Sequence, residues 1–277
     1  MSDSNMLALA IETYQRLLPE LNHTIAVDPT LAIGQNQLSP IPTLQELVEM
    51  VKPLPPQSCL VGLCEDGIPF LLDLAKGETG SILVTGDINC EKVRQLQVMV
   101  ESVIQLNSPH EVQVAVLTND PERWSAFKQE PDLSPYFAGI YAWYEQGATD
   151  LINRLVSLGV DRSQGRHRGA TILLIIDDLQ GVFNADFETQ NGLHWLLEYG
   201  VLSHIRSIAS LDASQCIKNP FWIDAFRTFL VGRIESLSLV ESLGYSQDSV
   251  ANLIPGLEFI AYTGQSWLKY CLPSLSI

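Results

Sequence analysis

The sequence of 277 residues lacks long hydrophobic runs and is poor in positive charge. No apolar stretch approaches the roughly 20 residues that a membrane-spanning helix needs, so we expect no insertion into a membrane. Lysine and arginine number 16 against 32 acidic residues, which gives a net charge of −16. Because proteins hold nucleic-acid phosphates with lysine and arginine, direct nucleic-acid binding is not expected.

Residues that commonly bind metals are few and badly spaced. The five cysteines are scattered without a C-x-x-C pair, and the five histidines show no metal-ligand spacing, so we expect no metal site. An odd number of scattered cysteines is typical of reduced thiols, and the N-terminus shows no secretory signal. These features predict a cytoplasmic protein.

The chain has enough apolar side chains for a large core, since 46% of its residues are hydrophobic and 17% are charged. Residues 1–57 are expected to form a helical extension with a proline-rich linker. Within it, apolar residues recur at helical spacing over residues 3–19. A second helix is predicted over residues 43–51, where Thr43 and Glu46 have the spacing of a capping box.

Residues 58–277 alternate between strand and helix patterns, which predicts a three-layer α/β domain with a mostly parallel sheet. Glu65-Asp66-Gly67 marks the turn of an initial hairpin. The run Thr171–Ile176 is continuously apolar, as in a parallel strand buried on both faces. The aromatic stretch 131–146 is expected to be irregular. The other strands are expected at 81–85, 111–117, 205–209, 229–234 and 258–262, and the helices at 91–106, 121–128, 150–160, 191–199, 222–227, 237–243 and 246–253.

The segment from Gly86 to Val93 has the outline of a phosphate-binding loop. Such a loop reads G-x-x-x-x-G-K-[ST]: its glycines let backbone N–H groups surround the phosphates, its lysine binds them, and its hydroxyl holds Mg²⁺. Gly86 and Lys92 keep their places, but Glu91 replaces the second glycine and Val93 replaces the hydroxyl residue. Since a carboxylate repels phosphate and valine cannot ligate Mg²⁺, the segment indicates a nucleotide-hydrolase fold that no longer hydrolyses nucleotide.

A second motif lies about ninety residues further on, where the apolar run Ile172–Ile176 ends at Asp177 and Asp178. In an active enzyme the first such carboxylate supports Mg²⁺, and the next acidic residue orients the attacking water. Asp177 suits the first task. Asp178 stands where glutamate is usual. Its side chain is one methylene shorter, so its carboxylate extends less far toward the attacking water.

The order and spacing of these segments resemble the FtsK/SpoIIIE-type motor ATPases, which are related to HerA and the conjugation coupling proteins. The resemblance covers about residues 58–272 and rests on the hairpin and strand that lead to Gly86, on Ile172–Asp178, and on Gly200–Ser210 as the strand before the sensor motif. It implies a RecA-like P-loop NTPase fold with degenerate Walker motifs.

Departures from the family pattern affect several catalytic positions together. After the sensor strand the family has a glutamine that senses the γ-phosphate and then an arginine, whereas this chain has Leu211 and Asp212. The resemblance therefore implies a vestigial site without catalytic residues. Its Walker A positions are Gly86, Glu91, Lys92 and Val93, and its Walker B positions are Asp177 and Asp178.

These observations favour a catalytically inactive domain that acts as a scaffold or adaptor in a multiprotein assembly, without a cofactor. Its partners are expected to be proteins, either an active ATPase relative or further copies of the chain. Two alternatives stay open. One is a divergent ATPase motor subunit that uses MgATP to translocate DNA or protein. The other is a switch that binds nucleotide through Lys92 and Asp177 without turnover.

Two further groups of residues have open interpretations. One is a basic turn, which is either a solvated turn or a source of an arginine that reaches a neighbouring subunit. The other is an aromatic group, which is either a partner-binding surface or a loop packed on the sheet. The basic turn contains Arg162, Arg166, His167 and Arg168, and the aromatic group contains Tyr136, Phe137, Tyr141, Trp143 and Tyr144.

Overall fold

The computed structural model describes residues 41–55, 57–245, 250–262 and 267–275. The predicted helix over 3–19 and the start of the one over 246–253 lie outside these residues. At the centre is a ten-stranded sheet with the order β2-β1-β10-β9-β8-β3-β7-β6-β4-β5. The strands are β1 (Ser58–Cys64), β2 (Pro69–Asp73), β3 (Ser81–Gly86), β4 (Val112–Thr118), β5 (Phe137–Ala142), β6 (Thr171–Asp177), β7 (Ile205–Asp212), β8 (Phe226–Val231), β9 (Glu258–Tyr262) and β10 (Trp267–Cys271).

The strands from β8 to β5 in this order are parallel to one another, whereas β2, β1, β10 and β9 form an antiparallel extension. β3 is flanked by β8 and β7, and β6 lies one strand further away. The phosphate-loop strand and the carboxylate strand are therefore separated by a single strand. The sequence prediction of a RecA-like P-loop NTPase fold with a mostly parallel sheet is confirmed.

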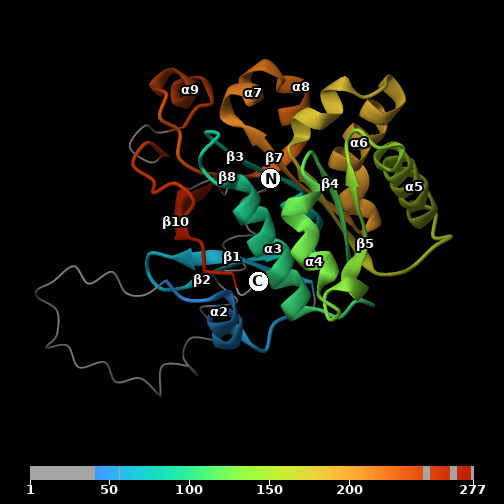
Figure 1. Ribbon diagram of the computed structural model, residues 1–277, viewed down its shortest axis with the longest axis horizontal. Helices are drawn as coiled ribbons and strands as arrows, with labels where there is room; N and C mark the ends of the chain where they lie inside the picture. The colour runs from blue at the N-terminus through green and yellow to red at the C-terminus, as the bar shows by residue number, and fades with distance from the viewer. Residues whose placement is uncertain (1–40, 56, 246–249, 263–266, 276–277) are drawn as a thin grey trace, which may run out of the picture.

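Helices cover both faces of the parallel sheet. On one face α3 (Lys92–Leu106) and α4 (Ser125–Gln129) contribute to one core cluster, and they lie in front of the strands in Figure 1. On the other face α5 (Gln146–Ser163) and α6 (Phe187–Tyr199) contribute to a second, and they lie together on the right. The short helices α7 (Ala213–Lys218), α8 (Pro220–Ile223) and α9 (Leu237–Ser242) follow β7 and β8. No described helix has the length and apolar character needed to cross a membrane.

The predicted capping box is present at α2 (Leu44–Val51). The Thr43 N–H donates to Glu46 Oε2 at 2.7 Å, and the Glu46 N–H donates to Thr43 Oγ1 at 3.2 Å. The buried face of α2 packs against Leu60 of β1 and Val98 of α3. Just before α2, Thr43 forms a parallel bridge with Ser274, in which the Leu44 N–H donates to the Ser274 carbonyl and the Ser274 N–H donates to the Pro42 carbonyl.

Two segments differ from the sequence prediction. The stretch 131–146 is not irregular, because Phe137–Ala142 forms β5 and pairs in parallel with β4 along the edge of the sheet. The aromatic residues of this segment gave no clear alternation of apolar and polar positions, so the strand was not predicted. It is stabilised by its pairing with β4. The helix predicted over 222–227 ends at Ile223, and strand β8 already begins at Phe226. The bounds and register of β8 are set by its pairing with β3, and the spacing of apolar residues alone does not predict that pairing.

Candidate functional site

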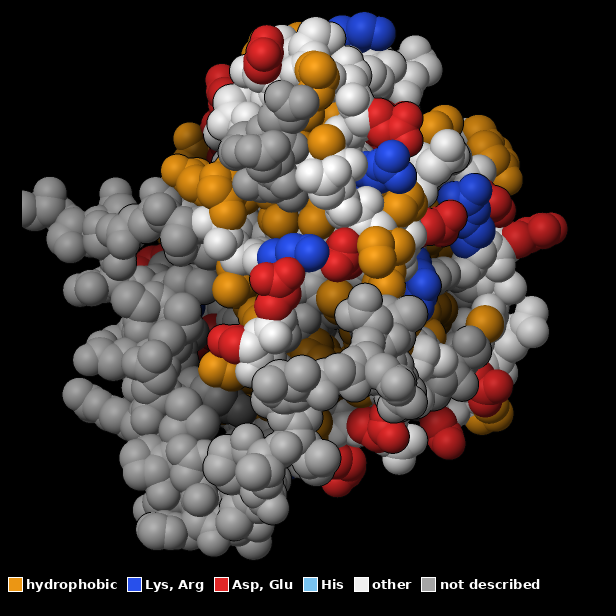
Figure 2. Space-filling view, turned by 90° about the vertical axis from the view of Figure 1, so that its left-hand side faces the viewer, with side chains coloured by type: hydrophobic (Ala, Val, Ile, Leu, Met, Phe, Trp, Pro, Cys, Tyr) orange, Lys and Arg blue, Asp and Glu red, His pale blue; other side chains and the backbone are white. Residues whose placement is uncertain are grey.

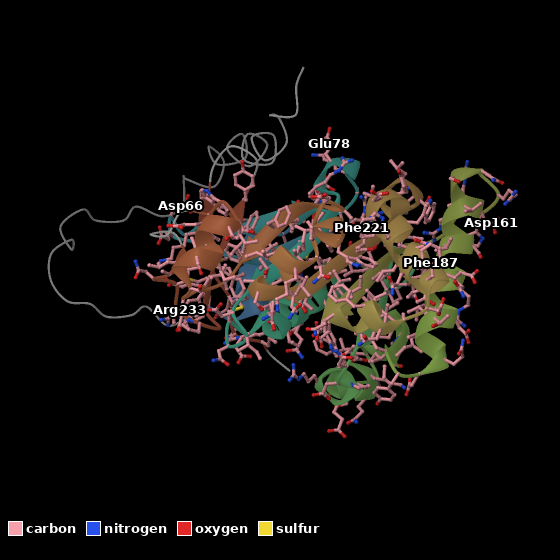
Figure 3. All side chains as sticks on the ribbon, turned by 90° about the horizontal axis from the view of Figure 1, so that it is seen from above. Asp66, Glu78, Asp161, Phe187, Phe221 and Arg233 are labelled. Carbon is pink, nitrogen blue, oxygen red and sulfur yellow. The ribbon has the colours of Figure 1, made fainter. Side chains whose placement is uncertain are left out.

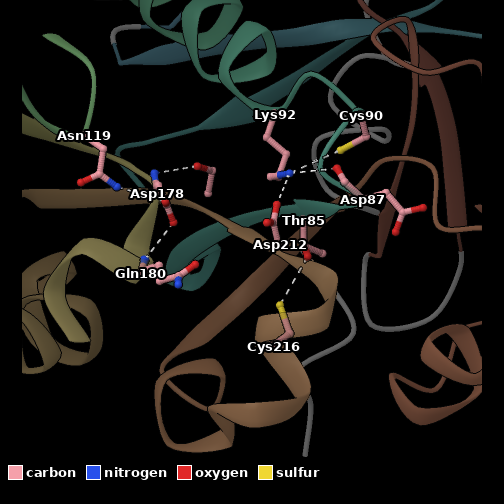
Figure 4. A network of polar contacts seen from close by, with 10 residues as sticks. Thr85, Asp87, Cys90, Lys92, Asn119, Asp178, Gln180, Asp212 and Cys216 are labelled. Carbon is pink, nitrogen blue, oxygen red and sulfur yellow. Dashed lines mark hydrogen bonds and ion pairs between the residues drawn. The ribbon is translucent and has the colours of Figure 1, made fainter. Parts of the chain in front are cut away.

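The predicted site residues gather where the carboxyl ends of β3, β7 and β6 meet, the edge at which open parallel sheets bind ligands. The loop 87–91 joins β3 to α3, Asp212 ends β7, and Asp178 follows β6 (Figure 4). A cavity of about 380 Å³ lies beside the loop. Its polar lining includes Asp87, Asp212, Arg233 and Glu235.

The loop keeps a tight shape that depends on Gly86. This residue has φ +148°, and a Cβ added there would lie 2.5 Å from Cys90 Sγ. The Asp87 N–H donates to the Arg233 carbonyl at 2.9 Å, and the Cys90 N–H donates to the Asp87 carbonyl at 3.1 Å. The N–H groups of Asp87 and Cys90, two of those in the loop, are thus bonded within the protein.

Glu91, at the position of the second loop glycine, has a left-handed backbone with φ +57° and immediately precedes α3. Its side chain makes no capping hydrogen bond and packs against Gly256, where an added Cβ would come within 2.9 Å of Glu91 Cγ. Glu91 thus keeps the left-handed backbone conformation that glycine favours at this position, but its side chain occupies space that a glycine would leave open.

Lys92 is held by groups of the chain itself. Its Nζ lies 2.6 Å from Asp212 Oδ1 and donates to the Asp87 carbonyl at 2.9 Å (Figure 4). The Lys92 side chain is 10% exposed and that of Asp212 is 33% exposed. The internal carboxylate therefore neutralises the charge that binds phosphate in an active loop.

Val93 follows Lys92 and packs, partly buried, against the core between α3 and the sheet. Its side chain has no oxygen to offer a cation. The hydroxyl that would complete an Mg²⁺ site is therefore replaced by an apolar contact.

Asp177 is buried and faces β4 rather than solvent. Its Oδ2 accepts hydrogen bonds from Thr118 Oγ1 and from Trp124 Nε1, each at 3.0 Å. Burial raises the pKa of the Asp177 carboxyl above its usual value, and the hydrogen bonds from Trp124 and Thr118 oppose that rise. The carboxylate ties β6 to the segment after β4.

Asp178 also has partners within the chain. Its Oδ1 accepts the Gln180 N–H at 3.0 Å, its Oδ2 accepts Asn119 Nδ2 at 3.1 Å, and its own N–H donates to Ser210 Oγ at 2.9 Å. With φ +70°, Asp178 caps the 3₁₀ helix that follows β6. Both carboxylates of the predicted Walker B motif therefore serve structural contacts.

The residues present do not fit MgATP. The lysine is paired with Asp212, the Mg²⁺ hydroxyl is replaced by Val93, and Asp87 and Glu235 add carboxylates to the cavity lining. Among the described residues, no group of three or more histidine, cysteine or acidic side chains is arranged to hold a metal ion.

Sequence reasoning noted Asp212 as a departure but missed its pairing with Lys92, and it missed Asp87, Arg233 and Glu235. The strand order of the sheet places β7 beside β3, and no local sequence pattern predicts that these two strands are neighbours. The only signal available was an acid at a position where the resemblance puts a base.

The two further groups of residues take mainly structural roles. In the basic turn, Arg162 donates to the carbonyls of Ser203, His204 and Ala170, and Arg166 pairs with Asp161 at 2.6 Å. In the aromatic group, Trp143 Nε1 donates to the Asp178 carbonyl and Tyr136 Oη donates to the Asn107 carbonyl. Tyr144 alone in the group points outward, with 77% of its surface exposed.

Solved structures with a similar fold include a type VII secretion ATPase and a conjugation coupling protein. ATPases 2 and 3 of Thermomonospora curvata EccC, in complex with a signal sequence peptide, match with a TM-score of 0.63 and 17% identity over 84% of this chain and 43% of theirs. ATPases 2 and 3 of Geobacillus thermodenitrificans EssC match with 0.64 and 14% over 80% and 48%. The pCW3 conjugation coupling protein TcpA, with ATPγS, matches with 0.63 and 16% over 95% and 82%.

The chain thus spans less than half the length of the EccC and EssC chains that it matches. At these identities the likeness establishes the fold, that of the P-loop ATPase domains which the sequence was found to resemble. No protein-family model matches the sequence, and a search of curated proteins gave no match.

Proposed function

We propose that this chain is a catalytically inactive, ATPase-like domain that serves as a scaffold or adaptor in a protein assembly. The observation that carries the proposal is the ion pair between Lys92 and Asp212 at 2.6 Å, in which a carboxylate takes the partner position of a phosphate. A nucleotide would have to displace that carboxylate and then gain no Mg²⁺ ligand from Val93.

The charges around the cavity support the same proposal. Asp87, Asp212 and Glu235 line it against one guanidinium, that of Arg233, which already pairs with Glu235 at 3.1 Å. Two like charges about 4 Å apart repel by about 4 kcal/mol at an effective dielectric constant of about 20. Lys92 and Arg233 are already paired with Asp212 and Glu235, so a triphosphate here would meet the Asp87 carboxylate and would have to compete for both cations, which is why we propose no nucleotide cofactor.

A role in protein assembly is supported by the kind of protein that shares the fold. One similar structure is a type VII secretion ATPase, EccC, and another is a conjugation coupling protein. The net charge of −16 disfavours direct contact with nucleic acid. On the face with α9 and the β9–β10 pair, red and blue side chains are interspersed among the described residues, without a continuous basic stripe (Figure 2).

Thermal unfolding with and without millimolar MgATP tests the nucleotide half of the proposal. A ligand at about 100 times its Kd stabilises by about 2.7 kcal/mol, which raises the Tm of a domain of this size by several degrees. We expect no rise for the wild-type chain. A rise that disappears in Lys92→Ala, but persists in the surface control Lys52→Ala, would contradict the proposal.

The adaptor half is tested by purifying tagged wild-type, Lys92→Ala and Asp177→Asn chains with their bound proteins from the source cell. A scaffold retains the same partners in all three. The alternatives, a divergent MgATP motor or a nucleotide-binding switch, are favoured by the retention of Gly86 and Lys92 in the loop. They predict partner loss in both variants together with a nucleotide-dependent Tm in the wild type.

A further inference from the structure

Exposed apolar side chains gather around α6 and α8, away from the phosphate-loop cavity. Phe187 at the start of α6 is 79% exposed, Phe221 in α8 is 61% exposed, and Leu202 just after α6 is 73% exposed. Figure 3 labels Phe187 and Phe221 and shows both well separated from Arg233, which lines the cavity. Exposed apolar side chains that form a contiguous patch on a folded domain mark interaction sites, whereas singly scattered ones do not.

The geometry joins these groups into one ridge. Phe187, His194 and Glu198 are spaced at i, i+7 and i+11 and so share one face of α6. The Phe221 ring stacks on the His194 ring, with centroids 4.1 Å apart and planes 17° apart, and His194 Nε2 lies 3.2 Å from the Phe221 carbonyl oxygen. α8 is therefore held against α6, and Phe221 adds its exposed ring to the helix face. We call Phe187, His194, Glu198 and Phe221 the α6–α8 ridge.

The charge beside the ridge has one sign along α6. Glu188 and Glu198 are exposed on this helix, and Phe187–Tyr199 contains no lysine or arginine. Glu198 Oε2 lies 3.7 Å from His194 Nδ1, which carries a charge only when the imidazole is protonated. Between Asp186 and Ile217 the one basic residue besides histidine is Arg206, which is buried in β7. Lys218, at the end of α7 and three residues before Phe221, is exposed, so the one-sided charge belongs to α6 and not to α8. The face of α6 thus offers aromatic surface flanked by carboxylates.

We propose that the α6–α8 ridge docks an amphipathic, basic helical segment of a partner protein. Apolar side chains of that segment would cover Phe187 and Phe221, and its lysines or arginines would pair with Glu188 and Glu198. Exposed aromatic residues supply much of the binding free energy at protein interfaces, and complementary charge fixes the partner's identity and orientation. A second copy of this chain fits poorly, because two molecules of net charge −16 repel each other.

The test uses a fluorescent model helix with leucine on one face and lysine on the other, titrated against the full chain at about 0.15 M salt. The same helix with glutamate in place of lysine serves as the charge control. We expect the lysine helix to bind, and Phe221→Ser and Phe187→Ser each to weaken it about tenfold. Glu188→Gln with Glu198→Gln should weaken it further as a pair and flatten its dependence on salt.

Matched controls come from α9, where Leu237 is 49% exposed and Glu241 is an exposed acid on another part of the surface. Leu237→Ser and Glu241→Gln should leave the affinity unchanged. Thermal unfolding of each variant shows whether it is folded. If the control variants weaken binding as much as the ridge variants, or the glutamate helix binds equally well, the proposal is overturned. It is also overturned if the chain forms a dimer that Phe221→Ser dissociates.

This proposal extends the adaptor role but stands on a separate part of the molecule. Lys92→Ala should leave binding of the lysine helix intact. A Tm that responds to MgATP would defeat the proposed function and leave the ridge untouched, whereas loss of site specificity in the helix titration would defeat the ridge alone.

Discussion

Lys92 and Asp212 belong to different elements, the first turn of α3 and the end of β7, and their ion pair links the two. Since the Asp212 side chain is one-third exposed, breaking this ion pair should cost more free energy than breaking an exposed pair and less than breaking a fully buried pair. Its importance lies in selectivity: a lysine that already has a counter-ion gains little from binding a further anion.

Removing both partners should cost less free energy of unfolding than the sum of the two single removals. We expect Lys92→Ala and Asp212→Ala each to lower the free energy of unfolding by about 1–2 kcal/mol, after allowance for solvent screening. The double variant should lose less than the sum, because no unpaired charge is left. Urea unfolding of the four chains measures the coupling free energy. Additive losses would mean that the two charges do not interact.

Asp177 gives a prediction about pH. Because burial raises its folded pKa, the native state holds the proton more tightly than the unfolded chain between the two pKa values, so this carboxyl's contribution to stability falls as pH rises through that range. Asp177→Asn keeps an acceptor for Thr118 and Trp124 without the charge. We expect it to be at least as stable as the wild type at pH 7 and to lose that advantage towards about pH 4.

Urea unfolding at several pH values checks this expectation. Asp177→Ala, which leaves both donors without an acceptor, should be less stable than Asp177→Asn by about 1–3 kcal/mol at every pH. An advantage of Asp177→Asn that grows on acidification has the wrong sign for a raised pKa and would contradict the assignment.

At the scale of elements, the turn from β3 into α3 is shaped by packing against the segment after β8. Gly86 approaches Cys90, and Asp87 bonds to Arg233, while the Gly232 N–H donates to the Thr85 carbonyl at 2.8 Å. The loop is therefore held in shape by contacts within the chain.

Gly86→Ala should destabilise the domain by about 2 kcal/mol or more, because its Cβ would meet Cys90 Sγ and its φ of +148° is unfavourable for alanine. Gly77→Ala is the matched control, since an added Cβ there meets nothing within 4 Å and its φ lies outside the positive range. It should change stability by less than about 0.5 kcal/mol. Equal Tm values for both variants would contradict the tight-loop description.

The sequence predicted the individual helices and strands better than it predicted the tertiary contacts between them. Thr43 and Glu46 lie three residues apart, so their capping box could be predicted from the local sequence. The continuous apolar run of β6 likewise predicted that this strand is buried. The partner of Lys92 is 120 residues away, and only the pairing of β3 with β7 brings Asp212 to it. Likewise, the sequence identified Asp177 as a vestigial Walker B carboxylate but could not show that Trp124, from a segment after β4, donates a hydrogen bond to it.

At the scale of the whole molecule, the cysteines are distributed over separate parts of the core. Burial raises the pKa of Cys59 and Cys64 to about 12, and that of Cys90 and Cys216 to about 11. Because the thiolate is the reactive form, these four thiols should resist alkylation at pH 8 in the folded protein. They should then react together, at the rate of global unfolding, as urea is added.

Mass spectrometry of alkylated protein at increasing urea concentration measures this. Cys271, which is only partly buried, should be modified first. Early and selective modification of Cys90, which lines the phosphate-loop cavity, would instead reveal local opening of that loop below the global transition.

The bridge between Thr43 and Ser274 has a mechanical consequence. The two segments run in parallel, with the Leu44 N–H bonded to the Ser274 carbonyl at 2.9 Å and the Ser274 N–H bonded to the Pro42 carbonyl at 3.0 Å. A force that pulls the preceding segment and the following segment apart along the chain acts on both hydrogen bonds in shear, so they resist together rather than one after the other. Tension passing through this domain is carried first by that clasp, and the sheet behind it stays unloaded until the clasp yields.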